Sequence, residues 1–535
     1  MAKPKTPNQK RKYSELNLRL AKYVALVEDI YGQLNLEAAK LVSNNTDYHA
    51  DTGKPFRWSD YPQTRKKIND IQKQFVEDIQ AVIQRGTSEE WKNSNEVQDL
   101  LANAVLRAYD AQVDGEKYKV LYQENSDALK AFQERKDKGF GISGKLWDQS
   151  AIYKQELEEA ISCAIQKGTS AITLSKQISK YLQDFSGLQK DYKEHFGTAS
   201  RAKDCEYCSI RLARSEINMA YRQAENLRWQ NMDFVVGYEI KLSGSHHVHD
   251  ICDQLKGKYP KTFVWTGWHP NDLCYKIPIL KTEEEFWEWD GRGEATTESI
   301  NEVKDVPDGF KRWVLYNQDR IDSAKKRRTL PYFLKDNKSI YQGINVDKSV
   351  KEIASRAQTV GGEVQSLAES IAKKYGGFVT PVNFKTESSI LRKVSAEGIT
   401  PYDIKDAVRT TIIVPDDRIE GVLRELSVTH SFIRLKRQRP ESFMGYSGNI
   451  VNIQSSNGLI AEIQVNTERM IYAKEKQSDA QRILGKERWE EIRKNTGMEG
   501  GLGHQYYEEW RLLDRASDEA QKIAQKSIEY YSHFR

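Results

Sequence analysis

The chain has 535 residues and a formal net charge of +5, with 38% hydrophobic, 10% aromatic and 30% charged residues. Aromatic surface at this level offsets the entropy cost of ordering the chain, which excludes an intrinsically disordered protein. Single cores stop growing near ~250–300 residues, so we expect about three domains.

No stretch approaches the ~18 to 20 consecutive apolar residues that cross a bilayer. The N-terminus, MAKPKTPNQKRK, is basic and lacks the apolar core of a secretory signal. We therefore expect a cytosolic protein with no membrane partner. The small positive charge permits local contact with nucleic acid but does not establish it.

Residues 1–195 have the apolar periodicity of helices. Leu157, Ile161 and Ile165 recur at four-residue intervals, and residues 174–182 repeat this spacing, which predicts a helical hairpin. A third helix is expected within residues 209–230, where an apolar stripe lies beside a mostly charged face.

Residues 196–282 favour a small α/β core, because segments 234–243 and 274–280 have the composition of strands. Residues 283–345 begin with an acidic stretch of little periodicity, which we interpret as a linker.

Residues 346–535 alternate between helix and strand patterns. Helices are expected at 363–375 and 417–426, and strands at 407–415, 449–455 and 459–467. The expected fold class is a multidomain α+β protein whose C-terminal α/β domain has a mixed sheet.

Two of the five cysteines lie in a segment that is rich in metal-ligand side chains. Zinc takes four ligands from Cys, His or Asp. The candidates are Cys252, His269 and Cys274, with Asp250, His246 or His249 as the fourth. Cys205 and Cys208, three residues apart, are a second candidate pair. Simple burial of the thiols is the alternative to a metal.

Five ordered segments resemble the Mu F-like minor head, or head morphogenesis, proteins of tailed phages. They lie within residues 90–282 and include RLARSEINMAYRQAE, HDICDQLKG and GWHPNDLCYKIPIL. Arg211, Arg214 and Glu216 match the family's helix motif, and the residues from Asp250 to Cys274 match its Asp-Cys and His-Pro motifs. The resemblance implies a structural component of the virion, assembled in the host cytoplasm, with portal proteins, capsid proteins and phage DNA as partners.

The C-terminal domain carries the side chains that phosphoryl or pyrophosphoryl transfer requires. Such transfer needs cations for the triphosphate, carboxylates for a divalent metal ion, and a base for the attacking hydroxyl. The inventory, in chain order, is Lys385, Ser389, Lys393, Asp406, Arg409, Arg434, Lys436, Tyr446, Glu462 and Gln464. Lys385 and Lys393 are expected along the first turns of one helix, and Glu462 and Gln464 on one strand face.

This order resembles the synthetase domain of the RelA/SpoT alarmone synthetases over residues 350–515. The resemblance implies that Lys385, Ser389 and Lys393 contact ATP phosphates. It implies that Asp406 and Glu462 hold Mg²⁺, with Glu462 also a base toward a ribose 3′-hydroxyl. Tyr446 would stack on the base of the acceptor, which is GDP, GTP or tRNA.

Four positions depart from the family pattern. Asn383, Ile450 and Asn466 stand where the family has arginine, histidine and arginine. The family's strand arginine falls at Thr411, but Arg409 lies one strand repeat earlier and faces the same side. These departures leave two functions open: a pyrophosphokinase of the RelA/SpoT type, or a structural virion protein with an inactive domain that binds nucleotide or nucleic acid.

Overall fold

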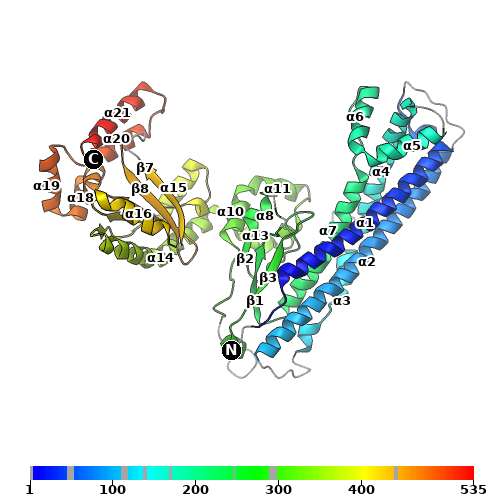
Figure 1. The fold of residues 1–535 in the computed structure, drawn as a ribbon, viewed down its shortest axis with the longest axis horizontal. Coiled ribbons are helices and arrows are strands. Elements are labelled where there is room, and N and C mark those ends of the chain that lie inside the picture. Colours follow the sequence, from blue (N-terminus) through cyan, green and yellow to red (C-terminus); the bar gives the residue numbers. More distant parts are fainter. Residues whose placement is uncertain are drawn as a thin grey trace. The chain divides into compact units, whose positions relative to one another are not determined.

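The computed structural model describes residues 4–44, 54–109, 118–136, 141–167, 171–244, 246, 249–287, 298–429, 431–438 and 444–535. The chain divides into unit 1, Met1–Gln342, and unit 2, Gly343–Arg535 (Figure 1). Within the described ranges, none of the helices has the length and apolarity that a membrane span requires.

Unit 1 is built mainly from helices. They are α1 (Gln9–Ser43), α2 (Pro62–Ala108), α3 (Ser126–Glu134), α4 (Ile142–Lys167), α5 (Ala171–Gln183), α6 (Phe185–Phe196) and α7 (Cys205–Gln230). The long helices α1 and α2 pack against each other and against α7 (Figure 1). The helices predicted for residues 1–195 are confirmed, and the predicted hairpin consists of α4 and α5.

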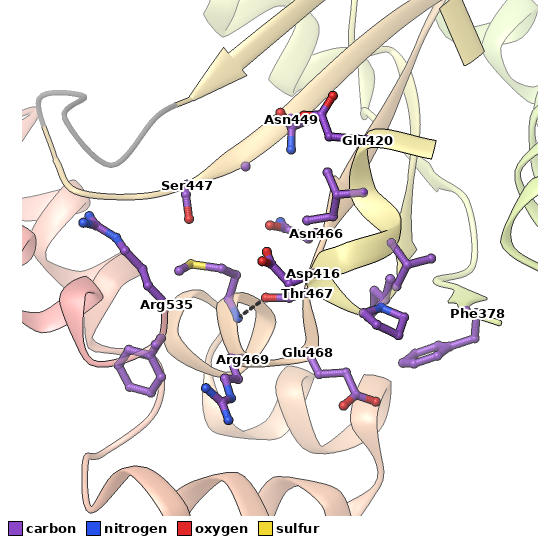
Figure 2. A pocket seen from close by; sticks show the side chains of 18 of the residues that line it. Phe378, Asp416, Glu420, Ser447, Asn449, Asn466, Thr467, Glu468, Arg469 and Arg535 are labelled. Carbon is purple, nitrogen blue, oxygen red and sulfur yellow. Dashed lines mark hydrogen bonds between the residues drawn. The ribbon is translucent and has the colours of Figure 1, made fainter. Parts of the chain in front are cut away.

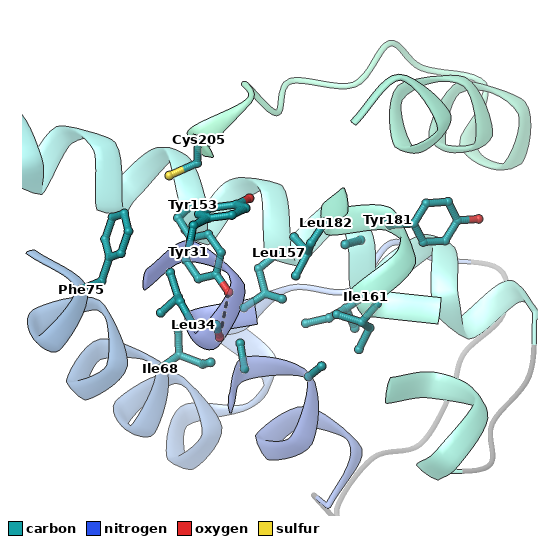
Figure 3. Packing of buried hydrophobic residues seen from close by; sticks show 14 of the residues in the cluster. Tyr31, Leu34, Ile68, Phe75, Tyr153, Leu157, Ile161, Tyr181, Leu182 and Cys205 are labelled. Atoms are coloured by element: carbon teal, nitrogen blue, oxygen red, sulfur yellow. Dashed lines mark hydrogen bonds between the residues drawn. The ribbon is translucent and has the colours of Figure 1, made fainter. Parts of the chain in front are cut away.

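The core between these helices combines aromatic and aliphatic side chains (Figure 3). The rings of Tyr31 and Tyr153 meet edge to face with their centroids 5.8 Å apart. The Tyr153 hydroxyl donates a hydrogen bond of 3.4 Å to the Leu34 carbonyl oxygen. Leu157 and Ile161, on the predicted stripe, are fully buried, and each such side chain stabilises the fold by ~1.5–3 kcal/mol.

Unit 1 also contains an antiparallel sheet. Its strands are β1 (Val235–Lys241), β2 (Gly257–Tyr259) and β3 (Tyr275–Leu280), in the order β2-β1-β3. β1 and β3 confirm two predicted strands, whereas β2 is too short to show a periodicity. The short helix α8 (Ile251–Leu255) precedes β2.

The linker predicted at residues 283–345 is wrong for its second half. This half forms α10 (Asp308–Tyr316), α11 (Gln318–Lys326), α12 (Tyr332–Lys335) and α13 (Lys338–Gly343), after the short α9 (Glu283–Trp287). Phe310 lies 5.3 Å from Phe263, and Phe333 lies 5.2 Å from Trp268, between ring centroids. These aromatic contacts make residues 308–342 part of the unit 1 core.

Unit 2 is organised around a mixed sheet. Its strands are β4 (Phe378–Val379), β5 (Asn383–Phe384), β6 (Val408–Ile413), β7 (Phe432–Gln438), β8 (Gly448–Gln454) and β9 (Ile460–Asn466). The strand order is β4-β6-β9-β8-β7, with β5 also paired to β6. β6 and β9 are parallel and the other pairs are antiparallel, which confirms the predicted mixed sheet.

The helices of unit 2 leave the two faces of this sheet unequal. The helices are α14 (Val346–Lys374), α15 (Glu387–Glu397), α16 (Ile419–Ser427), α17 (Glu468–Lys474), α18 (Gln477–Leu484), α19 (Lys486–Thr496), α20 (Leu502–Trp510) and α21 (Asp518–Ser532). α14 packs on β6 and α16 on β7, β8 and β9 (Figure 1), over buried side chains such as Ile412, Val451 and Ile463. The alternate residues point to the opposite face, which we call the polar face.

Candidate functional site

Strand register gathers five of the predicted site residues on the polar face. One row across four strands consists of Arg409, Glu462, Asn452 and Arg434. The next row, one strand repeat further, consists of Thr411, Gln464, Ile450 and Lys436. Register partners in neighbouring strands lie on the same side of a sheet, so Arg409, Glu462, Gln464, Arg434 and Lys436 share this face.

Hydrogen bonds orient several side chains of the first row. Gln464 Nε2 donates to Glu462 Oε1 over 2.7 Å, which confirms that these side chains share a strand face. Arg434 donates from Nη2 to Asn452 Oδ1 over 2.9 Å. Its neighbour Arg437 instead donates to Glu420 of α16 over 2.9 Å, as strand alternation requires.

Asp406 lies beside the first row and is held by the two lysines predicted to bind phosphate. Its carboxylate accepts from Lys385 Nζ at 2.6 Å and from Lys393 Nζ at 3.0 Å. Burial raises the pKa of Asp406, but the hydrogen bonds and charges of the two lysines outweigh burial and hold that pKa below its usual value. Asn452 donates to the carbonyl oxygen of Lys405 over 3.4 Å, which links the Asp406 segment to the sheet.

Ser389 lies at the amino end of α15. Thr386 caps this helix by accepting from the Ser389 backbone N–H, and its hydroxyl also donates to Ser389 Oγ over 2.9 Å. Lys385 lies before the cap, so the expectation that Lys385 and Lys393 share one helix is wrong. The amino end of α15 still lies between the two lysines in sequence, and free N–H groups at such an end favour anions.

Tyr446 is positioned by a residue that departs from the family pattern. Asn466 Nδ2 donates to the Tyr446 hydroxyl oxygen over 2.6 Å. The Tyr446 ring meets Tyr531 of α21 edge to face at 5.4 Å between centroids. Tyr446 is half-buried, and it follows Gly445, whose φ of +71° suits glycine.

Lys474, the last residue of α17, is a site residue that the sequence analysis missed. Its Nζ lies 3.5 Å from Gln464 Oε1 and 5.7 Å from the centroid of the Tyr446 ring. Burial opposes its charge, but Tyr446 and Glu475 outweigh burial and raise the pKa of Lys474. Lys474 lies in a helix after β9, so the two-residue period of the strand does not place it. Only the tertiary fold brings it to the polar face.

A cavity of about 830 Å³ opens at the carboxyl ends of β6 and β9 (Figure 2). Its lining carries both signs of charge, from Asp416, Glu420, Glu468, Arg469, Arg488 and Arg535. None of the ten predicted site residues of unit 2 is among the described residues that line it. The candidate site is therefore the polar face, where Glu462 pairs in register with Arg409, together with Asp406, just before β6, and its two lysines. Asn466 lines the cavity and donates to Tyr446.

In unit 1, the predicted metal ligands lie together in a group that we call the His/Cys cluster: Asp250, Cys252, His269, Asp272 and Cys274. Ligand atoms of Asp250, Cys252 and His269 lie within 4.8 Å of one another, as do those of Cys252, Asp272 and Cys274. Asp272 is a member that the sequence analysis missed. A hydrogen bond to Cys274, together with burial, raises the pKa of the Cys252 thiol.

The other histidine candidates lie at the edge of this cluster. His246 Nε2 is 2.8 Å from an Asp253 oxygen and 3.7 Å from an Asp250 oxygen. The His249 side chain is 78% exposed and faces Asp253. Among the described residues, neither His246 nor His249 contacts Cys252 or Cys274, whereas His269 contacts Cys252. His269 is therefore the histidine of the cluster.

Among the residues that the structure describes, Cys205 and Cys208 lie outside the groups of three potential metal ligands. Cys205 is fully buried against the helical core (Figure 3), and its thiol donates to the Gln149 carbonyl oxygen over 3.4 Å. Cys205 is therefore a core thiol.

Comparison with known proteins finds relatives for about a third of the chain. No family model matches the chain, so the resemblance of residues 90–282 to Mu F-like proteins stays a prediction. The (p)ppApp synthetase toxin Tas1 of Pseudomonas aeruginosa (strain UCBPP-PA14) is 35% identical over 186 residues, which is 35% of this chain. About a third of the chain is similar to a RelA/SpoT-like synthetase toxin. The chain spans 42% of the length of Tas1.

Solved structures also match, among them the following two. In the complex between the Type VI effector Tas1 and its immunity protein, the matching chain is 35% identical, with 36% of this chain and 98% of that chain covered, at a TM-score of 0.34. The small alarmone synthetase 1 from Bacillus subtilis is 16% identical, with 34% of this chain and 90% of that chain covered, at a TM-score of 0.24.

Proposed function

We propose that unit 2 transfers pyrophosphate from ATP to the ribose 3′-hydroxyl of a nucleotide and releases AMP. The observation that carries this proposal is the polar face, where Glu462 pairs in register with Arg409 and shares its side of the sheet with Gln464. Asp406, held by its two lysines, lies just before the strand of Arg409, β6. The 35% identity to a (p)ppApp synthetase toxin supports the same reaction.

Each group has a role in this scheme. Asp406 and Glu462 offer carboxylate oxygens, which Mg²⁺ prefers, and the ion would neutralise phosphate charge. If Asp406 held this ion, Lys385 and Lys393, which now donate to its carboxylate, would be able to bind the triphosphate instead. Glu462 accepts the 3′-hydroxyl proton as the oxygen attacks the β-phosphorus. The bond from the β-phosphorus to the oxygen that bridges it to the α-phosphorus breaks, and that oxygen leaves with AMP.

Arg409 compensates for one departure from the family pattern. Asn383 occupies the place of a family arginine, and the register of β5 on β6 puts Asn383 directly opposite Arg409. Arg409 is exposed, so its guanidinium can reach the space that an arginine at position 383 would fill, and we assign it to the triphosphate.

We assign an adenosine nucleotide as the acceptor, because the 35% identical relative is a (p)ppApp synthetase toxin. The nucleobase of the acceptor would stack on the Tyr446 ring. Such stacking would contribute ~0.5–1.5 kcal/mol to the binding free energy beyond the contribution of the buried area. Asn466, which stands where the family has arginine, and Lys474 both lie beside Tyr446 at this end of the site.

The test measures AMP release by the full-length chain with ATP, Mg²⁺ and one acceptor at a time. We expect AMP together with a pyrophosphorylated adenosine nucleotide, and loss of both on chelation of Mg²⁺. A product formed only from GDP, GTP or tRNA would overturn the acceptor assignment. No AMP with any acceptor would overturn the reaction and favour an inactive, nucleotide-binding domain.

Replacing Gly448 by alanine should raise the KM for the acceptor about tenfold, equivalent to ~1.4 kcal/mol. A Cβ at Gly448 would lie 2.7 Å from the Tyr446 hydroxyl oxygen, so the ring must shift from the position in which Asn466 holds it. The control is Gly362→Ala in α14, where a Cβ meets nothing within 4 Å. Equal KM values for the two variants would show that Tyr446 does not bind the acceptor.

For unit 1 we propose the virion assembly role that the Mu F-like segments suggest. Its support is that the helix motif and the cysteine segment fold as one body. Asn218 and Arg222 of α7 donate to the Asp272 carbonyl oxygen over 3.0 and 2.9 Å. Quantitative mass spectrometry of purified phage particles should find the chain at a few copies, and its absence from particles would overturn this role.

A further inference from the structure

Three groups of the His/Cys cluster converge on one point in space. Cys252 Sγ lies 3.2 Å from His269 Nε2, and Asp250 Oδ2 lies 3.3 Å from the same nitrogen. The other ring nitrogen, Nδ1, lies 2.7 Å from the Pro270 carbonyl oxygen. A carbonyl only accepts, so Nδ1 carries the proton, and in the neutral ring Nε2 presents its lone pair to Cys252 and Asp250.

This geometry does not fit a thiol nucleophile with a histidine base. In such a relay, the cysteine contacts one ring nitrogen and the orienting carboxylate contacts the other. Here the sulfur and the carboxylate share Nε2, and a backbone carbonyl orients the ring. An imidazole whose far N–H is fixed by a carbonyl is the arrangement found in metal-ligating histidines.

We propose that Asp250, Cys252, His269 and Cys274 bind one Zn²⁺ ion. Zn–S bonds of ~2.3 Å and Zn–N bonds of ~2.0 Å at tetrahedral angles hold sulfur and nitrogen roughly 3.5 Å apart. The separations of 3.2 and 3.3 Å around His269 Nε2 are close to that value. Two thiolates, an imidazole and a carboxylate form a donor set that selects zinc over magnesium or calcium.

Cys274 is the fourth ligand in preference to Asp272. A ligand atom of each lies within 4.8 Å of Cys252 Sγ. Both Asp272 oxygens are engaged, because Oδ1 accepts from the Cys274 backbone N–H and Oδ2 from that of Trp268, each over 2.7 Å. In Asp250 only one carboxylate oxygen is engaged in this way: Oδ1 accepts from the Cys252 backbone N–H over 2.7 Å. The other oxygen, Oδ2, faces His269 and can bind the ion.

The ion would join two segments of the chain, the start of α8 and the loop before β3. Asp250 and Cys252 lie at the start of α8, His269 in the loop before β3, and Cys274 immediately before β3. Arg222 of α7 donates to the Cys274 carbonyl oxygen over 2.8 Å, so the ion is tied to the helical core. The two thiols are buried while His269 is 35% exposed at its side chain, which leaves an entry path for the ion.

The first experiment measures zinc in the full-length chain purified without added metal or chelator. We expect one zinc per chain, falling below a tenth of that in Cys252→Ser and in His269→Ala. Cys208→Ser is the matched control, because Cys208 is half-buried and outside the cluster, and it should keep its zinc. Equal zinc content in wild type and Cys252→Ser would overturn the proposal.

A second measurement does not depend on the variants folding. Wild type stripped of metal and given Co²⁺ should show thiolate-to-cobalt charge transfer and the visible bands of a tetrahedral site. Zinc should then displace cobalt and abolish these bands. Protein that takes up no cobalt, or shows only octahedral spectra, would leave His269 as a protonated bridge between Asp250 and Cys252 and would overturn the metal site.

Discussion

Glu462→Gln should lower AMP release by about 10²–10⁴-fold, the range that general acid–base groups contribute. Glutamine keeps the size of the side chain and an oxygen that accepts the Gln464 hydrogen bond, so the fold and the first row should persist. What disappears is the negative charge that would hold Mg²⁺ and take the 3′-hydroxyl proton. The measurement is the initial rate of AMP release with saturating ATP and acceptor.

The matched control for this prediction is Glu425→Gln on α16. Glu425 forms an exposed ion pair with Lys374 at 2.7 Å, on the helix that covers the other side of the sheet. Its loss should leave the rate within a factor of two. Full activity of Glu462→Gln, with an unchanged melting temperature, would remove Glu462 from the chemistry.

The sequence predicted the local part of this site because strand alternation is a local property. Glu462 and Gln464 are two residues apart, so a period of two places them on one face, and the structure confirms it. Arg409 and Thr411 obey the same rule. The predicted mixed sheet is also confirmed. Its long strands could be predicted because their apolar and β-branched composition is a local property as well.

Register was beyond the reach of the sequence. Arg409 and Glu462 are parallel partners although they lie far apart along the chain, and nothing in either strand specifies that alignment. Lys474 was missed because tertiary packing, not a repeat, brings it to Gln464. The prediction of a linker at 283–345 relied on the acidic, aperiodic beginning of this segment. The available signal against it was the pair of aromatic residues Phe310 and Phe333, which the structure shows to be buried.

Glu225→Ala should destabilise unit 1 by about 3–5 kcal/mol, the usual cost of leaving a buried charge unpaired. Glu225 of α7 and Lys276 of β3 are both fully buried with 3.5 Å between Oε2 and Nζ. Tyr13 of α1 also donates to Glu225 over 2.6 Å. Removing Glu225 takes away the carboxylate that is ion-paired with Lys276 and that accepts the Tyr13 hydrogen bond, and leaves Lys276 with the neutral acceptor Asn226. Urea unfolding followed by tryptophan fluorescence measures this, because nine of the eleven tryptophans belong to residues 1–342.

The exposed pair Lys73–Glu77, 3.9 Å apart, provides the control, and Glu77→Ala should change stability by less than about 0.5 kcal/mol. Burial raises the pKa of Glu225 and lowers that of Lys276 to about 8 despite their attraction, so desolvation outweighs the pair. Glu225→Leu with Lys276→Met should therefore recover most of the loss. A double variant as unstable as Glu225→Ala would contradict this account.

The same pair predicts a pH dependence with a defined sign. The pKa of Lys276 is about 8 in the folded chain against an ordinary 10.5, so the unfolded chain binds more protons between these values. The contribution of Lys276 to the free energy of unfolding must then rise with pH from about 8 to 10.5. Wild type should gain stability relative to the Glu225→Leu, Lys276→Met variant across this window, and parallel pH profiles would show that Lys276 keeps its charge when buried.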